Sequence, residues 1–140
     1  MQGKMTLQEM KESDRPEGKG RPRFRGHAYT PKKTVDYEKT VRTLYLKAGG
    51  NLIYGEVDIS ISAYFRIPKS VTKAERSKME LDLSRPTIKP DVDNIGKVIM
   101  DALGNAVAYN DDKQVVDLTV RKFYSERDFV YVTVKETEKP

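Results

Sequence analysis

The sequence contains no cysteine and only one histidine, His27, among its 140 residues. A zinc site or an iron–sulfur centre is therefore not expected, because both depend on cysteine or clustered histidine ligands. The sequence also lacks an apolar run long enough to cross a bilayer, and it lacks a charged leader followed by an apolar stretch. These absences predict a cytoplasmic protein with no membrane partner, and a length of 140 residues predicts one domain.

Positive charge is concentrated in one segment, residues 15–33. This segment has seven Lys or Arg residues against Glu17 alone, whereas the rest of the chain has 19 basic and 20 acidic residues. It is rich in Gly and Pro and interleaves Phe24, His27 and Tyr29 with the cations. Cations bind phosphates and flat rings stack on exposed bases, which favours a nucleic-acid contact loop over a solvated basic arm. The expected DNA-binding residues are Lys19, Arg21, Arg23, Arg25, Lys32 and Lys33.

Two pairs of aspartates flank a helical pattern between residues 89 and 114. Asp91 and Asp93 precede apolar residues at helical spacing, and the pattern predicts a helix capped by Asp93 and ended by Gly104. Asp111 and Asp112 follow in a turn before a strand-like run. The chain after Gly104 is long enough to return along the helix, so the second pair can lie beside the first.

Clustered carboxylates repel one another and need a proton or a cation between them. Hard oxygen ligands select Mg²⁺, Mn²⁺ or Ca²⁺. Lys97 lies one helical turn after Asp93, where it can stabilise negative charge on a phosphate or orient a water molecule. The alternative is ordinary capping and turn chemistry, with Lys97 in an ion pair with Asp93 or Asp101.

Periodicity predicts a single α+β domain with a small mixed β-sheet covered by helices. Thr34 is expected to cap a helix that ends at Gly49 and Gly50, with Val41, Leu44, Tyr45 and Ala48 on one face. Residues 57–65 alternate as a half-buried strand, and residues 72–79 are interpreted as a charged helical excursion outside the core. Strands near residues 116–120 and 129–134 are expected to pair across a turn at 125–128. An α/β layer with one parallel pair is the alternative.

The domain boundaries follow from the same patterns. Residues 1–14 are poorly defined, residues 15–135 form the domain, and residues 136–140 are expected to fray.

Three motifs in order, KGRPRF with AYTPKKT, KPDVDNIGKVIMDAL and NDDKQVV, resemble the RusA-like Holliday junction resolvases, endodeoxyribonucleases of bacteria and prophages. The resemblance covers roughly residues 19–134. It implies a homodimer that binds four-way junction DNA and cuts two symmetrically related strands with Mg²⁺, for which Mn²⁺ can substitute. By motif, the metal-binding and catalytic aspartates fall on Asp91, Asp93 and Asp112, the catalytic lysine on Lys97, and supporting positions on Asp111, Asn94 and Gln114. The first 20 residues depart from the family, because they do not read as its short apolar strand.

The implied chemistry is hydrolysis of a phosphodiester by a metal-activated water, in DNA recombination and repair. Two other functions compete with it. One is a non-catalytic junction-binding protein, and the other is a metal-dependent nuclease for other branched or linear nucleic acids. An RNA-binding module is disfavoured, because it gives the carboxylates no task.

Overall fold

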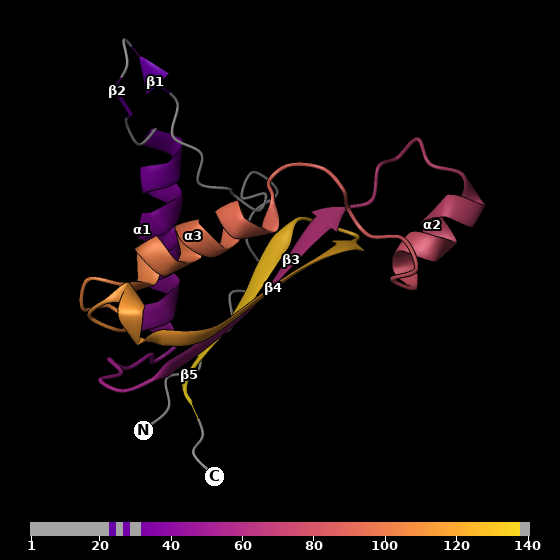
Figure 1. The fold of residues 1–140 in the computed structure, drawn as a ribbon. Coiled ribbons are helices and arrows are strands. Elements are labelled where there is room, and N and C mark those ends of the chain that lie inside the picture. Colours follow the sequence, from indigo (N-terminus) through magenta and orange to yellow (C-terminus); the bar gives the residue numbers. More distant parts are fainter. Residues whose placement is uncertain (1–22, 25–26, 29–31, 138–140) are drawn as a thin grey trace.

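The computed structural model describes residues 23–24, 27–28 and 32–137 (Figure 1). Two short strands, β1 (Arg23–Phe24) and β2 (His27–Ala28), form an antiparallel pair before the first helix, α1 (Lys32–Lys47). The remaining elements, in chain order, are β3 (Val57–Arg66), α2 (Lys73–Glu80), α3 (Val92–Leu103), the 3₁₀ turn η1 (Asp112–Gln114), β4 (Val115–Ser125) and β5 (Phe129–Glu136).

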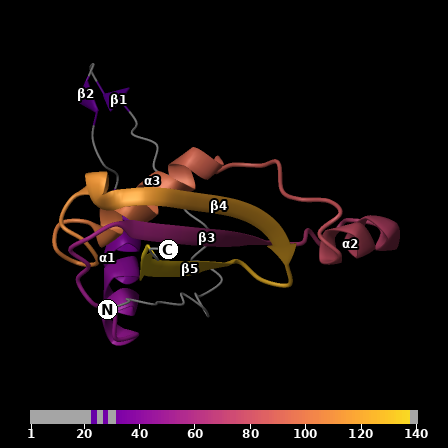
Figure 2. The ribbon, with the colours of Figure 1, turned by 60° about the horizontal axis from the view of Figure 1, so that its bottom comes forward.

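β3 is the central strand of a three-stranded mixed sheet in the order β4-β3-β5. It pairs parallel with β4 and antiparallel with β5, and Figure 2 shows it between them. The α+β class and the small mixed sheet are therefore confirmed. The predicted hairpin between β4 and β5 is wrong, because these strands do not pair with each other. The alternative interpretation correctly included one parallel pair.

The link between β4 and β5 crosses the end of β3 instead of folding back on itself. Two strands that flank a third are separated by about 9.6 Å, and the link from Ser125 to Phe129 is long enough for that. Asp128 Oδ1 accepts a hydrogen bond from the Arg66 backbone N–H at 2.8 Å, and the Ile67 N–H donates to the Ser125 carbonyl at 2.9 Å. These two bonds give acceptors to the backbone N–H groups of Arg66 and Ile67 at the end of β3, and so stabilise the crossing link.

The core lies between one face of the sheet and helices α1 and α3 (Figures 1 and 2). Alternate residues of β3 point into it, because successive strand side chains face opposite sides. The buried side chains are Val57, Ile59, Ile61, Ala63 and Phe65 of β3, Val130, Val132 and Val134 of β5, Val41 and Tyr45 of α1, and Ile95, Val98, Ile99, Ala102 and Leu103 of α3. The other face, called here the open face, carries polar and aromatic residues.

The helix boundaries match the predictions only in part. α1 begins at Lys32, so Thr34 lies inside the helix, where its side chain is buried instead of capping the end. Gly49 ends α1 as predicted, with a φ of +80° that favours glycine. α2 confirms the helical pattern, and Thr72 caps it in a capping box with Glu75. It lies beyond the end of the sheet (Figure 2).

The two faces of β3 predict responses of very different size to truncation at neighbouring positions. We expect Ile61→Ala to lower the free energy of unfolding by about 2–5 kcal/mol, because it removes buried methyl groups and leaves a cavity. Ser62→Ala, on the open face, should change it by about 0.5 kcal/mol or less. Urea denaturation of both variants measures this difference, and equal destabilisation would contradict the assignment of the two faces.

Candidate active site

The start of α3 carries the first acidic pair. Asp91 is the N-cap, with extended backbone angles, and its side chain makes no capping hydrogen bond. The prediction that Asp93 caps the helix is wrong. Asp93 instead lies in the first turn, where a negative charge is favoured by the positive end of the helix dipole. Both side chains are exposed, so the carboxylate oxygens of Asp91 and Asp93 are accessible to water at the start of the helix.

Lys97 and Asn94 lie on the same helix. Lys97 is exposed and follows Asp93 by four residues, a spacing that places both on one helix face. Asn94 is half-buried in the first turn. The buried stripe of α3 fixes the direction of this face, because Gly96 lies directly against β4. A Cβ atom at Gly96 would lie 3.2 Å from Leu118 and 3.3 Å from Val120.

The side chain of Gln114 anchors the turn that contains Asp111 and Asp112 through hydrogen bonds. Its amide N–H₂ group donates to the carbonyls of Ile53 at 2.9 Å and Gly55 at 3.1 Å. Its side-chain oxygen accepts from the backbone N–H groups of Asn110 at 2.8 Å and Asp111 at 3.1 Å. Four hydrogen bonds from one side chain therefore hold the turn against the segment before β3.

Asp111 is the N-cap of η1, and its carboxylate accepts from the Lys113 N–H at 3.0 Å. It forms a capping box with Gln114, so Asp111 has a local structural task. Asp112 is exposed, and its carboxylate lies near Gly104, at the C-terminal end of α3. A Cβ atom at Gly104 would lie 3.4 Å from Asp112 Oδ1.

Tyr109 connects this end of α3 to the acidic turn. Its ring is buried, and its hydroxyl donates to the Met100 carbonyl at 2.7 Å. Burial raises the pKa of Tyr109 well above the usual value, and the negative charges of Asp112 and Asp101 raise it further. The two carboxylates thus lie close enough to act on the phenol, at the C-terminal end of the helix.

The structure does not bring Asp112 beside Asp91 and Asp93. Asp112 lies against Gly104, and the helix from Asp93 to Gly104 rises about 16 Å. Among residues 23–24, 27–28 and 32–137, no three His, Cys, Asp or Glu side chains are grouped as metal ligands. The chain therefore does not return to the start of α3, because the turn is held at the helix end by Gln114 and Tyr109. Asp91 and Asp93 still offer the hard oxygen donors that Mg²⁺ prefers, and Mg²⁺ commonly takes only one or two protein carboxylates.

The basic segment lies largely outside the described residues. Lys19, Arg21 and Arg25 are outside them, and the structure describes the backbone of Arg23 in β1 and of Lys32 and Lys33 at the start of α1. Strands β1 and β2 lie just beyond the start of α1 (Figure 1). The assignment of these residues to DNA binding stays a prediction.

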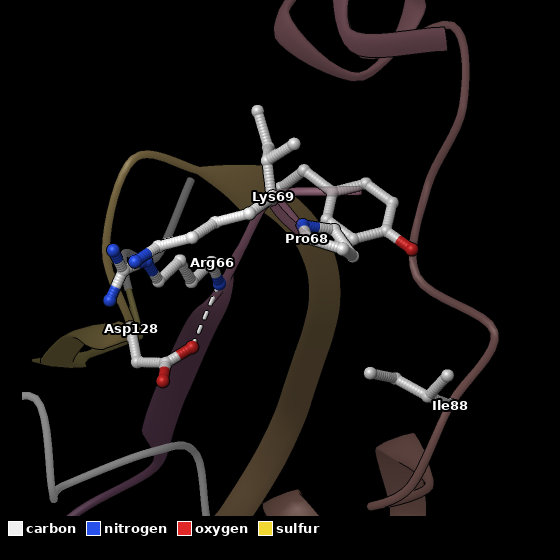
Figure 3. Close-up of a pocket in the computed structure, with 7 residues that line it drawn as sticks. Arg66, Pro68, Lys69, Ile88 and Asp128 are labelled. Carbon is white, nitrogen blue, oxygen red and sulfur yellow. Dashed lines mark hydrogen bonds between the residues drawn. The ribbon is translucent and has the colours of Figure 1, made fainter. Parts of the chain in front are cut away.

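Two features were missed in the sequence. One is a cavity of about 360 Å³ at the end of β3, where Arg66, Lys69 and Asp128 lie beside Pro68 and Ile88 (Figure 3). The other is a row of aromatic side chains on the open face, flanked by arginines. The row depends on the register between strands, which the sequence does not reveal.

Comparison with known families decides the class of protein. Residues 14–135 match the family model described as Endodeoxyribonuclease RusA, which covers most of the chain. The chain belongs to the RusA endodeoxyribonuclease family. The predicted resemblance to RusA is thereby confirmed.

Bacillus subtilis (strain 168) has a relative of this RusA family member, named uncharacterized protein YqaN. The two are 49% identical over 87 residues, which span 61% of this chain and 61% of that protein. No helix in the described part of the chain has the length and apolar character needed to span a bilayer.

The pKa of Tyr109 predicts how the folded state responds to alkali. Below about pH 10 the phenol is neutral in both the folded and the unfolded chain, so its contribution is constant. Above that pH it ionises in the unfolded chain first, which favours unfolding. We expect the free energy of unfolding to fall as pH rises from about 10, and to fall less steeply in Tyr109→Phe. Urea titrations at several alkaline pH values measure both slopes, and identical slopes would contradict the raised pKa.

Proposed function

We propose that this chain is a Mg²⁺-dependent endodeoxyribonuclease that resolves four-way DNA junctions as a homodimer in the cytoplasm. Family membership over residues 14–135 supports the nuclease class. The observation that carries the proposal is the start of α3, where two exposed carboxylates and Lys97 occur within two helical turns. This set of groups suits hydrolysis of a phosphodiester better than nucleic-acid binding alone, because carboxylates repel phosphate unless a cation lies between them.

The roles of the side chains follow from their chemistry. Asp91 and Asp93 would hold the ion through carboxylate oxygens, with water and phosphate oxygens completing its shell. When bound, Mg²⁺ lowers the pKa of a water molecule and polarises the scissile phosphate. Lys97, one turn after Asp93, would stabilise the negative charge that develops on the phosphate or orient the attacking water. Gln114 and Asp111 would keep the acidic turn in place.

Asp112 needs a second copy of the chain in order to act with Asp91 and Asp93. Within one chain it lies about a helix length away from them. Movement of its turn would break the four hydrogen bonds of Gln114 and expose the buried Tyr109. In a two-fold dimer, Asp112 of one chain can approach the start of α3 in the other without such movement. Two such shared sites also suit a substrate with near two-fold symmetry.

A non-catalytic junction-binding protein is the second candidate function. The separation of Asp112 from the other aspartates favours it, because no three-carboxylate site then forms among the described residues of a single chain. The two candidates differ in their response to a ligand variant, since loss of a carboxylate removes cleavage only from a nuclease.

We expect Asp93→Asn to abolish cleavage of a labelled four-way junction while preserving or strengthening its binding. The variant removes a metal ligand and also removes one negative charge that repels phosphate. Asp36→Asn, which neutralises an exposed carboxylate on α1, is the charge-matched control and should cut normally. Gel assays of binding and cleavage, with Mg²⁺ and with EDTA, measure both properties. Retained cleavage in Asp93→Asn would reject the assignment of the metal site.

A shared site predicts complementation between two inactive variants. In a mixture of Asp93→Asn and Asp112→Asn chains, each mixed dimer contains one site with all three aspartates if Asp112 acts across the interface. About half the dimers are mixed and one of their two sites is intact, so nicking should recover to about a quarter of the wild-type level. The nicks should fall on one strand of each junction.

The two variants assayed separately are the control for this mixture. If Asp112 acts within its own chain, no intact site forms and the mixture stays inactive. That result would reject the shared site. It would not decide whether the protein is a nuclease, which cleavage by the wild-type protein tests separately.

A further inference from the structure

The open face of the sheet is organised into rows across its three strands. The register aligns Asp117, Asp58 and Lys135 in one row, then Thr119, Ser60 and Thr133, then Arg121, Ser62 and Tyr131, and finally Phe123, Tyr64 and Phe129. Charge and ring character therefore change along the strands. The acidic residues lie at the end where β3 begins, and the aromatic residues lie at the end where β3 finishes.

The aromatic row is extended by an arginine at each side. The Tyr64 ring stacks on Phe129, with centroids 4.3 Å apart and planes at 7°, and on Phe123 at 5.5 Å and 26°. Arg85 Cζ lies 4.5 Å from the Phe123 ring centroid, and Arg127 Cζ lies 5.5 Å from that of Phe129. We call these five residues the arginine-capped row. Packing accounts for three stacked rings, but it does not require a cation at both ends.

The position of Arg85 is fixed by two contacts. Its guanidinium lies over Phe123, and its Nε–H donates to the Lys122 carbonyl at 2.8 Å. A guanidinium has five N–H donors, so this bond leaves four for other acceptors. An arginine already held by a ring and a carbonyl loses little further freedom when it binds a phosphate, and its planar fork matches two phosphate oxygens.

Positive charge gathers around the same end of the open face. Arg121 is exposed one row away from the aromatic side chains. Arg66 and Lys69 lie at the adjacent cavity, with Asp128 as the acidic side chain of that cavity (Figure 3). At the opposite end of the face, Asp58 and Asp117 share a row with Lys135, so that row carries more negative than positive charge. The surplus of positive charge therefore lies toward the end that carries the arginine-capped row, and Arg121 lies between the two ends, where it also lines a pocket with Asp58 and Lys135.

We propose that the arginine-capped row and Arg121 form a second nucleic-acid contact surface, which binds the phosphate backbone of a DNA strand. Serine, threonine and tyrosine hydroxyls in the neighbouring rows supply further hydrogen bonds to phosphate oxygens. This surface is made by the sheet and is separate in sequence from the basic segment at residues 15–33. The choice of DNA as the polyanion depends on the proposed function, whereas phosphate binding depends on the sheet alone.

The test compares two triple variants that lose the same charge. Arg85→Ala/Arg121→Ala/Arg127→Ala removes the surface, and Lys47→Ala/Lys73→Ala/Lys78→Ala removes three exposed cations on α1 and α2. Binding of each full-length variant to a labelled four-way junction is measured over a range of salt concentrations. Each phosphate contact contributes about 0.9 to the slope of log K against log salt. We expect the slope to fall by roughly 2–3 units in the arginine variant and by less than about one unit in the lysine variant.

Circular dichroism checks that the arginine variant is folded. If it is not, Arg121→Glu replaces it, because Arg121 is exposed and lies outside the stack. That single variant should reduce the slope by about one unit or more. An arginine variant that binds like the lysine variant, or an Arg121→Glu variant that binds like wild type, would overturn the proposed surface.

Cleavage by the wild-type protein separates this inference from the proposed function. If wild type cuts the junction and the arginine variant binds it unchanged, only the surface is rejected. If wild type binds DNA with a slope that depends on the three arginines but does not cut any substrate, the surface stands and the nuclease proposal fails.

Discussion

The pairing of β3 with strands on both sides is the interaction on which the rest of the structure depends. Its alternate residues are completely buried against α1 and α3, and the residues between them form the centre of the open face. Because β4 runs parallel to β3, the chain must travel back along the sheet between these two strands, and α3 makes part of that return. The position of α3, and with it the candidate active site, follows from this crossover.

The rigidity of α3 then separates the acidic residues. A helix whose inner face packs on the sheet keeps its two ends apart by its own length, so Asp93 and Asp112 belong to opposite ends. Gln114 and Tyr109 hold Asp112 where it is. The same constraint leaves Asp91, Asp93 and Lys97 exposed in a fixed arrangement at the helix start. In the proposed dimer, two-fold symmetry would bring Asp112 of one chain to the start of α3 in the other.

Features set by local pattern were predictable from the sequence. The alternation of β3 and the apolar stripe of α3 up to Gly104 depend on neighbouring residues, and both are present. The hairpin was predicted wrongly, and the return of Asp112 to the helix start, which the chain length allows, does not occur within one chain; both depend on contacts between distant segments. A three-residue link favours a hairpin locally, yet β3 inserts between its two strands and pairs with both. The arginine-capped row depends on the register of three strands, which no local pattern specifies.

The most direct test of Mg²⁺-dependent junction resolution is cleavage of a labelled synthetic four-way junction by the wild-type protein. Linear duplex and flap DNA serve as matched substrates, and each reaction is run with Mg²⁺ and with EDTA. We expect paired, symmetric nicks in the junction with Mg²⁺, none with EDTA, and no comparable cutting of the other substrates. Tight junction binding without nicks, or equal cutting of duplex DNA, would contradict this function.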